Sequence, residues 1–576
     1  MTTPAARALA ALGESEAVLL KGISLPRSGS AKLVGSRSPT GTDVPVGPVT
    51  ADGEPIYDLA ARQDIQGNII PGFNKNHQQF LFLRFADVTG ARQWLHWLAP
   101  RLATMDEVLT FRRAFRAERL RLGVREPAMT ATWDAIAFSH RGIAVLVGTE
   151  QANQFGEQSF RQGLAERSTY LGDPADPAAL GHRDKWVIGG PGNEADALLI
   201  IAADDEADLT AEVDEIVGRA TDHGIQVVFS QRGDNLPGNL QGHEHFGFKD
   251  GISQPGIRGA VSAAPGDRLT PRYLAEIDPH ARLFAKPGQP LIWPGEFLLG
   301  EPRQDPRDPY LSAPPAGNFP SWARRGSYLV CRRLRQDVIA FWEFAATVAA
   351  QLGVSAVHAA AMLVGRWPSG APLSRSSGQD NLVLAGDEFA NNHFLFDDDT
   401  RPSVMTPIPG YGGDNHPAAG QDIFGTVCPH AAHIRKVNPR DSATDFGAPA
   451  DTLLRLMLRR GIPFGPPIAG VAAPSPDLIA QERGLLFVAY ASTIEDQFEF
   501  VTRRWANSAV QPNLGGEDPI IGQRERYGSR NRSIDLPTAD GGTTAIALRQ
   551  EFVTPTGGGY FFAPPISAVA GILAGR

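Results

Sequence analysis

The chain has 576 residues, of which 42% are hydrophobic, so it is long enough to form more than one core. Its net charge of −9 and pI of about 5.8 provide no basic character, which argues against nucleic acid and anionic membranes as partners. Its two cysteines are too few for a disulfide-stapled scaffold or a Cys-ligated zinc ribbon.

The N-terminal region shows no targeting pattern. Its first 30 residues contain neither a cationic segment followed by an apolar core nor a twin-arginine pair. The longest candidate membrane span, Val338–Leu352, contains Glu343 and is shorter than the ~18 apolar residues that a span requires. We therefore expect a cytoplasmic protein. Residues 26–56 are rich in Pro, Gly, Ser and Thr, and we expect residues 1–56 to form an extended or mobile arm.

Alternating strand and helix patterns follow the arm. Short apolar runs rich in β-forming residues predict strands, and apolar residues at helical spacing predict helices. In chain order these are the strand Gln79–Phe85, the helix Ala91–Leu102, the strand Trp133–Phe138, the helix Arg141–Val147, the strand Ala197–Ala202, the helix Leu209–Ala220 and the strand Gln226–Ser230.

The second half of the chain repeats this organisation. The strand Gly326–Arg332 precedes the helix Gln336–Leu352, and the strand Gly484–Ala491 precedes a helix from Ile494 to Ala506. Two such series predict an α+β fold with two antiparallel sheets, each with helices packed on one face. We expect domains at residues 57–290 and 291–576. The long Pro- and Gly-rich stretches 286–325 and 367–421 are typical of walls or lids around a site.

The densest cluster of reactive side chains is Gln241–Gly256, with the sequence QGHEHFGFKDGISQPG. Its glycines allow tight turns and a close approach to a ligand. Asp250 either caps a backbone amide in such a turn or acts as a functional acid. His243 and His245 have strand-like spacing and could share a metal, but two histidines alone do not define a metal site.

A second cluster is Cys428–Arg440, with the sequence CPHAAHIRKVNPR. His430 and His433 are three residues apart, which would place them on one face of a helix. The nearby cations Arg435, Lys436 and Arg440 would suit an imidazole ligand beside an anionic cofactor such as haem, whose propionates they could neutralise. A buried histidine without any ligand role is the alternative.

The third cluster is Leu458–Gly465, with the sequence LRRGIPFG. It follows a helical pattern over Thr452–Leu458, which Gly461 and Pro463 end. Of the two adjacent arginines, one is expected to face solvent and the other a cleft.

In this order the three clusters resemble the dye-decolorizing peroxidase family, in particular its longer branch of fungal and some bacterial enzymes. The segment from Gly247 to Gly251 matches the GxxDG signature of that family, within the longer match HFGFKDGISQPGI. The two other clusters resemble its proximal-histidine and distal-arginine segments. Further similar segments are DIQGNII, GSYLVCRRLRQDV, LVGRWPSGAPL, YASTIEDQFEFVTRRWAN and GGGYFFAPP, so that the resemblance covers residues 60 to 570.

The resemblance implies two ferredoxin-like domains and one haem b, held mainly by the C-terminal half. His433 would be the iron ligand rather than His430, Asp250 and Arg459 would be the catalytic groups on the peroxide side, and Arg440 would bind the cofactor. A ligating histidine normally donates its second N–H to an acceptor. We expect that acceptor to be Glu495 or Asp496, because both follow a predicted core strand.

These assignments predict a peroxidase that reduces hydrogen peroxide and oxidises dyes and phenolic or other aromatic donors through a ferryl intermediate. Asp250 would move the proton and Arg459 would stabilise the developing anion. Bulky dyes cannot reach a buried haem, so we expect electrons to leave through surface Trp or Tyr residues.

Three alternatives remain open at this level. The first is a haem carrier or storage protein with the same fold and no significant turnover. The second is another haem enzyme on a related scaffold, such as a chlorite dismutase, a family that lacks an aspartate in the place of Asp250. The third is a haem-free metal-binding or interaction protein built around His243, His245, His430 and His433.

Overall fold

The structure of the protein is a computed structural model that describes all residues except 1–47, 123–128, 409, 445–449, 469–474 and 524–531. Most of the predicted arm therefore lies outside the described residues. Its end, residues 48–56, is bound to the rest of the protein. Glu54 is buried, and its carboxylate accepts hydrogen bonds from Arg258 at 3.2 Å and from Arg272 at 2.7 Å. This end of the arm is therefore not mobile, because these arginines hold the carboxylate, and it contains no helix.

The N-terminal half contains all of the strands and helices that its patterns predict. Its strands β2, β3, β1 and β4 lie side by side in that order, and all neighbours are antiparallel. Helix α3 follows β1, and helix α9 connects β3 to β4. This is the β-α-β-β-α-β arrangement of a ferredoxin-like domain. The bounds are β1 His77–Phe85, α3 Val88–Leu98, β2 Thr132–Phe138, α5 His140–Val147, β3 Ala197–Ala203, α9 Glu206–Asp222 and β4 Ile225–Asp234.

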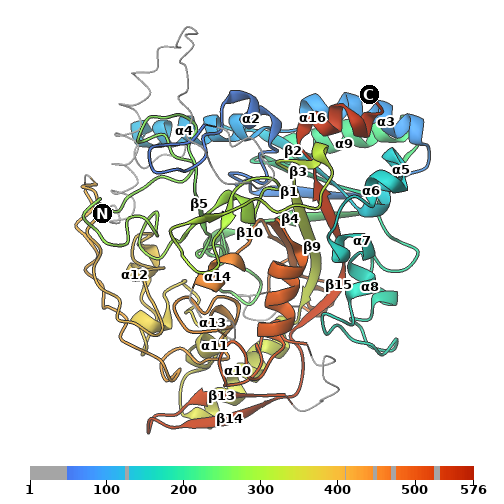
Figure 1. Ribbon diagram of the computed structural model, residues 1–576. Helices are drawn as coiled ribbons and strands as arrows, with labels where there is room; N and C mark the ends of the chain where they lie inside the picture. The colour runs from blue at the N-terminus through green and yellow to red at the C-terminus, as the bar shows by residue number, and fades with distance from the viewer. Residues whose placement is uncertain (1–47, 123–128, 409, 445–449, 469–474, 524–531) are drawn as a thin grey trace.

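The C-terminal half repeats this strand order. Across the sheet, the spatial order of its strands is β10, β12, β9 and β15, and all neighbours are antiparallel. Strand β11 also pairs with β12. The register pair Phe562 and Phe138 joins β15 to β2, so that the two halves form one nine-stranded sheet (Figure 1). The two predicted ferredoxin-like units are confirmed. The bounds are β9 Ser327–Gln336, α10 Val338–Leu352, β10 Leu458–Arg459, β11 Ile462–Phe464, β12 Gly484–Ala491 and β15 Val553–Ala563.

The boundary that we predict at residue 290 remains a prediction. Strand β5 (Gly256–Ile257) pairs in parallel with β6 (Leu291–Ile292), so backbone hydrogen bonds link the two sides of this boundary.

Two helix predictions in the C-terminal half are wrong in part. The segment predicted as one α-helix consists of two consecutive π-helices, η7 (Ile494–Glu499) and η8 (Val501–Ala506). Of the helix predicted at 452–458, only residues 452–454 are helical, as the end of the short helix α14 (Ala450–Leu454). The chain then enters β10. Pairing of β10 with β12 overrides the local helical pattern, and it places Arg459 on a strand instead of at a helix end.

Several elements have no counterpart in the sequence predictions, among them the long helix α4. The remaining elements are α2 Leu59–Asp64, α4 Met105–Leu122, α6 Thr149–Ala152, α7 Gln158–Gln162, α8 Leu164–Arg167, β7 Arg303–Gln304, β8 Ser312–Ala313, α11 Ala356–Val364, α12 Leu382–Gly386, α13 His433–Val437, α15 Pro476–Ala480, β13 Arg532–Pro537, β14 Thr543–Leu548 and α16 Ile566–Ala570.

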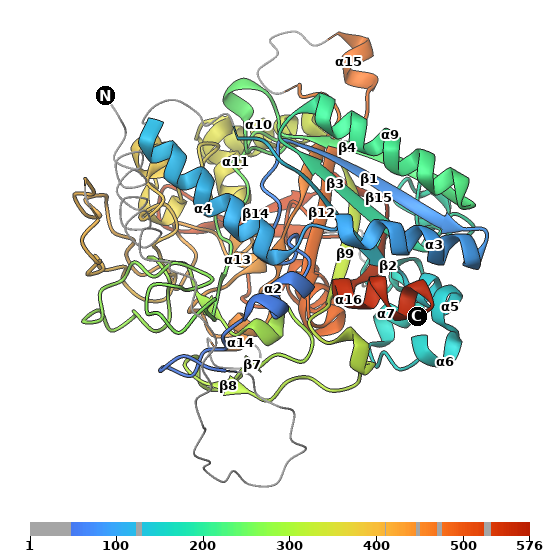
Figure 2. The same cartoon turned by 90° about the horizontal axis from the view of Figure 1, so that it is seen from above.

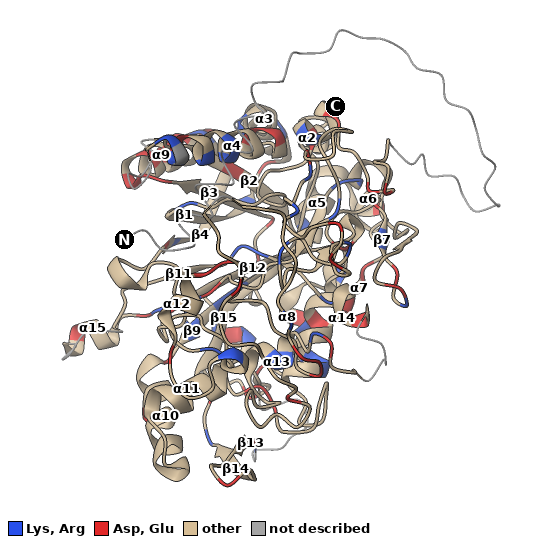
Figure 3. Cartoon of the chain, turned by 90° about the vertical axis from the view of Figure 1, so that its left-hand side faces the viewer, with Lys and Arg blue, Asp and Glu red and all other residues tan. Residues whose placement is uncertain are grey.

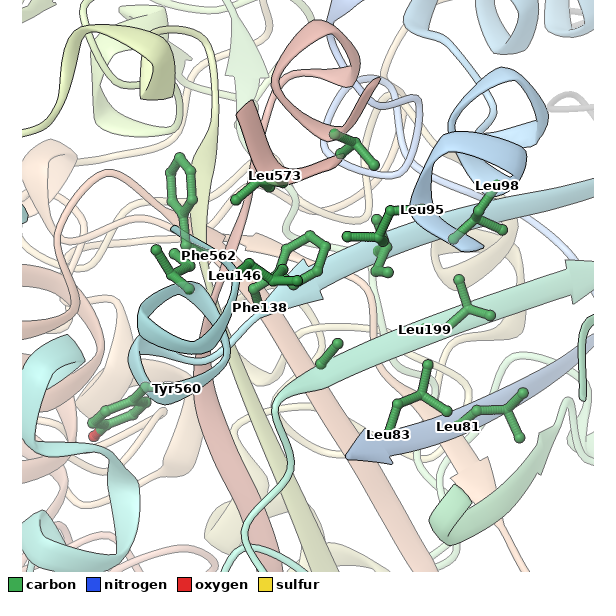
Figure 4. Packing of buried hydrophobic residues seen from close by; sticks show 14 of the residues in the cluster. Leu81, Leu83, Leu95, Leu98, Phe138, Leu146, Leu199, Tyr560, Phe562 and Leu573 are labelled. Carbon is green, nitrogen blue, oxygen red and sulfur yellow. The ribbon is translucent and has the colours of Figure 1, made fainter. Parts of the chain in front are cut away.

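The largest core lies between the sheet and the helices α3, α5 and α9. Figure 2 shows α3 and α9 lying across the strands of the N-terminal half, with α16 beside α3. Leu95 and Leu98 of α3 point toward Leu83 and Leu199 of the strands in Figure 4. Because Phe562 of β15 belongs to the same core, the two halves share one apolar interior.

The outer helices α4 and α9 contain charged residues of both signs, coloured blue and red in Figure 3. Within the described residues, no single helix is long and apolar enough to cross a membrane. Helices α10 and α11 pass that test only as a pair, and they are bent by 106° relative to each other. Many of their apolar residues, including Phe341 and Leu363, are buried in a second core.

Candidate active site

A cavity of ≈ 360 Å³ lies beside the C-terminal half of the sheet. Strands β9, β10, β12 and β15 contribute to its wall, and so do helix α13 and the loop that follows β4. All four residues that the sequence assigns to the site line this cavity: Asp250, His433, Arg440 and Arg459. Its apolar wall includes Leu334, Ile434, Phe487, Phe498 and Val553. Residues from both halves of the chain therefore meet at one place.

His433 is the first residue of α13, and its ring is fixed by one strong hydrogen bond. Its Nδ1 lies 2.8 Å from Oδ2 of Asp518, and the Asp518 side chain is fully buried. This contact assigns the proton to Nδ1, which leaves the lone pair of Nε2 free to bind a metal. Burial alone lowers the pKa of His433, but the Asp518 carboxylate outweighs it and raises the pKa above its ordinary value.

Asp518 itself is held as a carboxylate. Its Oδ1 accepts hydrogen bonds from the backbone N–H groups of Ile520 at 2.8 Å and Ile521 at 3.0 Å. Burial raises the pKa of Asp518, but His433 and these two N–H groups outweigh burial, so that the pKa lies below its ordinary value. The buried negative charge raises the basicity of the imidazole and fixes its orientation.

The prediction that Glu495 or Asp496 supports His433 is therefore wrong. Glu495 accepts hydrogen bonds from Ser159, and the backbone carbonyl of Asp496 accepts one from Arg455. Neither Glu495 nor Asp496 lines the cavity that contains His433. Asp518 lies 85 positions after His433, and the only local signal for it is an acidic residue directly before an apolar Pro-Ile-Ile segment.

Asp518→Asn is expected to weaken haem binding or peroxide turnover about 10–100-fold, because removal of an outer-shell carboxylate of a metal-bound histidine has effects of this size. Asparagine keeps the shape and removes the charge. Haem titration and steady-state rates measure the effect, and Asp540→Asn in an exposed turn is the matched control. An Asp518→Asn variant with the affinity and rate of the wild type would show that the contact has no functional role.

Glu495 instead belongs to an acidic pair with Glu157. Oε1 of Glu157 accepts hydrogen bonds from the backbone N–H of Glu495 at 2.7 Å and from the Thr493 hydroxyl at 2.9 Å. Burial, together with the Glu495 carboxylate, raises the pKa of Glu157 from 4.5 to about 7.

Glu157→Gln is expected to make the stability of the protein less dependent on pH. A carboxyl group whose pKa is higher in the folded state stabilises the fold below its unfolded pKa and loses this contribution as pH rises through the folded value. The free energy of unfolding of the wild type should therefore fall between pH 5 and pH 8 by more than that of the variant. Urea unfolding at the two pH values measures this, with the exposed Glu150→Gln as control. Equal pH dependence in wild type and variant would refute the assignment.

Asp250 lies in a tight loop after β4. Gly247 and Gly251 have φ angles of +94° and +76°, a region that favours glycine. The backbone N–H of Asp250 donates to Gly242 O at 3.0 Å, and Oδ1 of Asp250 accepts from the N–H of Gly251 at 2.6 Å. The capping contact that the sequence allowed is thus present. It occupies one carboxylate oxygen, and the residue lines the cavity as well.

Arg459 approaches the same cavity from β10. Its guanidinium donates to Ser253 O at 3.4 Å, and burial lowers the pKa of Arg459 while the Asp250 charge opposes this effect. Arg460 points elsewhere, since its guanidinium donates to the backbone carbonyls of Asn68, Ile69 and Pro71. Of the two adjacent arginines, Arg459 is the one that faces the cavity.

The cationic residues at the cavity differ in part from the predicted triplet. Arg440 lines the cavity, whereas Arg435 is buried against Asp422, and Lys436 donates to the backbone carbonyls of Ser508 and Gln511. The prediction that Arg435 and Lys436 face an anionic cofactor is therefore wrong, because neither residue lines the cavity and internal partners bind both side chains.

Arg366 supplies the cation that the sequence analysis missed. It lines the cavity, and Asn392 Oδ1 accepts hydrogen bonds from both Arg366 and Arg440, at 2.9 Å and 2.6 Å. Burial, with the charges of Arg440 and Arg459, lowers the pKa of Arg366 to about 9. Arg366 lies in the segment LVGRWPSGAPL, which shows a family resemblance but no cluster of charged residues. An isolated arginine gives no local signal of a binding role.

The four histidines do not form a metal centre. His243 and His245 contact the backbone carbonyls of Gln241 and Phe464, and His430 precedes helix α13 instead of sharing a helical face with His433. In the part of the chain that the structure describes, no three His, Cys, Asp or Glu side chains are grouped to hold a metal ion. A metal site built only from protein side chains is not supported.

Comparisons with known proteins agree with this geometry. A family model described as the DyP dimeric alpha+beta barrel domain matches residues 64–237, and one described as Dyp-type peroxidase, C-terminal, matches residues 312–513. The chain belongs to the dye-decolorizing peroxidase family. Peroxidase 2 of Mycetinis scorodonius is 31% identical over 522 residues, which cover 88% of this chain and 87% of that protein.

Other members of the dye-decolorizing peroxidase family show the same extent of similarity. Multifunctional dye peroxidase DyP2 of an Amycolatopsis species is 29% identical over 88% of this chain and 94% of its own length. The structure of an ancestral D-type dye decolorizing peroxidase is 30% identical, covers 89% of this chain and 99% of its own, and superposes with a TM-score of 0.69. The crystal structure of a decolorizing peroxidase from Auricularia auricula-judae gives a TM-score of 0.65 at 28% identity.

Dye-decolorizing peroxidases are haem enzymes, and the cavity has the chemistry that haem requires. The Nε2 lone pair of His433 can ligate iron, the apolar wall suits a flat porphyrin, and Arg366 and Arg440 provide positive charge for its carboxylates. Nε of Arg332 and Oε1 of Gln336 are buried without a hydrogen-bond partner, and both residues line the cavity. The residues therefore fit the group.

Proposed function

We propose that this dye-decolorizing peroxidase binds haem b and uses hydrogen peroxide to oxidise dyes and phenolic or other aromatic donors. One observation carries the proposal. His433, paired with a buried carboxylate, shares a cavity with an acid and a half-buried arginine, Asp250 and Arg459. An imidazole ligand, a proton carrier and a fixed cation are the three groups that cleavage of a peroxide bond requires.

His433 would hold the iron through Nε2, and Arg366 and Arg440 would bind the haem carboxylates. Bound haem supplies the redox chemistry that the protein side chains lack. Asp518 keeps the proton of His433 on Nδ1, so that Nε2 remains a ligand throughout turnover. The apolar wall of the cavity excludes water from the reacting groups.

Asp250 would move one proton. Its Oδ1 is engaged by the N–H of Gly251, which leaves Oδ2 to accept a proton from one peroxide oxygen and return it to the other. Arg459 would stabilise the negative charge that develops on the leaving oxygen. Its charge has a strong effect there because the half-buried guanidinium lies at the cavity, where the local dielectric constant is lower than in water.

A carboxylate base predicts activity at acidic pH, since aspartate ordinarily titrates near pH 3.9 and remains deprotonated well below neutrality. Bleaching of an anthraquinone dye by the haem-loaded protein and hydrogen peroxide is therefore expected to be fastest at acidic pH. A pH–rate profile from pH 3 to 9 provides the test. A maximum above neutrality would count against Asp250 as the base, and absence of bleaching at any pH would favour a haem carrier.

A further inference from the structure

Gln254 lies four residues after Asp250, and its side-chain amide makes two hydrogen bonds to the backbone of Arg459. Nε2 donates to Arg459 O at 3.1 Å, and Oε1 accepts from the N–H of Arg459 at 3.3 Å. A side-chain amide thereby satisfies both backbone groups of one residue, as a neighbouring strand would.

The position of Arg459 in the sheet explains why its backbone groups need a partner from outside the sheet. Strand β10 has only two residues, and it pairs with β12 on one side, where Arg459 lies opposite Ala489 and the N–H of Arg460 donates to Val488 O at 2.7 Å. In an antiparallel ladder successive residues direct their N–H and C=O groups to opposite sides. The backbone groups of Arg459 face away from β12, and Gln254 covers this free side.

The same loop also contacts the guanidinium, because Ser253 O accepts a hydrogen bond from Arg459 at 3.4 Å. Gln254 is in turn held by Gln289, whose Nε2 donates to Gln254 O at 3.3 Å. A continuous segment of five residues thus carries Asp250 at one end and the contacts to Arg459 at the other.

We propose that Gln254 is a positioning residue that fixes Arg459 relative to Asp250. The proposal rests on the proposed function, in which Arg459 stabilises charge on the leaving oxygen. Without the amide, the N–H of Arg459 would lose its partner, the carbonyl of Arg459 would keep only its hydrogen bond from the Arg460 guanidinium, and this side of the two-residue strand would be held less firmly. The guanidinium of Arg459 would then spend less time at the position where it can stabilise the leaving oxygen.

Gln254→Met keeps the length and volume of the side chain and removes both hydrogen bonds. The second-order rate constant for the reaction of the haem-loaded variant with hydrogen peroxide is expected to fall about tenfold, the size expected for loss of such contacts. Haem content, Soret position and thermal midpoint should stay at wild-type values. Gln79→Met, which removes one hydrogen bond to Ser230 on β4, is the matched control. A Gln254→Met variant that reacts at the wild-type rate would overturn the proposal.

Gln254→Glu gives a readout that a purely structural role would not produce. A protonated carboxyl group has the same donor and acceptor as the amide, whereas the carboxylate has no donor for Arg459 O. The rate of the variant relative to wild type should therefore be near one at low pH and decrease as the glutamate ionises. A constant ratio across the pH range would contradict positioning through these two bonds.

The double variant Gln254→Met/Arg459→Leu separates this proposal from the proposed function. If Gln254 acts through Arg459, its substitution has no further effect once Arg459 is leucine. If Arg459→Leu itself leaves the peroxide reaction unchanged, the role of Arg459 fails. If Arg459→Leu slows the reaction and Gln254→Met then slows it further, only the positioning role fails.

Discussion

Arg459→Leu is expected to slow the reaction of the haem-loaded protein with hydrogen peroxide about 10²–10³-fold, the effect of removing one preorganised donor from a developing negative charge. Ser253 O accepts a hydrogen bond from the guanidinium, and the Gln254 side chain holds the backbone of Arg459, so the charge needs little reorganisation during the reaction. Leucine retains apolar contact with the cavity wall but provides neither charge nor donor. Stopped-flow absorbance at the Soret band measures the rate.

The specificity of this effect can be checked with a second arginine. Arg121 on α4 is exposed and forms an ion pair with Glu118, so Arg121→Leu should react with peroxide at the wild-type rate. Unchanged haem content in Arg459→Leu would show that the loss is one of rate and not of cofactor. A rate within twofold of wild type would exclude Arg459 from the charge-stabilising role.

His433→Ala is expected to lose iron ligation and, with it, peroxidase activity. In the proposed site the imidazole is the iron ligand, and Asp518 fixes its orientation. Alanine removes the ligating nitrogen and leaves Asp518 as an uncompensated buried carboxylate. The absorption spectrum after loading with haem and removal of the excess should therefore lack the Soret band of the wild type.

His430→Ala distinguishes between the two histidines of this segment. His430 does not contribute to the cavity wall, and burial lowers its pKa to about 4, as is typical of a neutral structural imidazole. Its substitution should leave the Soret band in place. The reverse pattern, with haem lost from His430→Ala and retained in His433→Ala, would exchange the two assignments.

Most of the sheet could be predicted from the sequence because its strands are buried on both faces. Runs such as ALLIIAA in β3 and GLLFVAYA in β12 are nearly all apolar, and no helical period fits them better. The repeated strand–helix order then indicated two similar units. The pairing of Phe562 with Phe138 that unites them involves the C-terminal strand, whose glycines conceal its strand character.

Contacts between distant segments explain what the sequence missed. The strand at Arg459 exists because β12 pairs with it, although the preceding residues have a helical pattern. Asp518 contacts His433, and Arg366 lines the cavity, from positions that no spacing rule connects to His433. The acids of the π-helical segment after β12 do not line the cavity, and Glu495 accepts hydrogen bonds from Ser159 instead.

Rapid mixing of the haem-loaded wild-type protein with hydrogen peroxide, with and without dye, tests the central claim most directly. The predicted result is a fast change of the Soret band that scales with peroxide concentration, recovery of the original spectrum when dye is present, and a response that is much slower in Arg459→Leu. A Soret band that remains unchanged in excess peroxide, with no loss of dye colour, would contradict the account and identify a protein that binds haem without turning over peroxide.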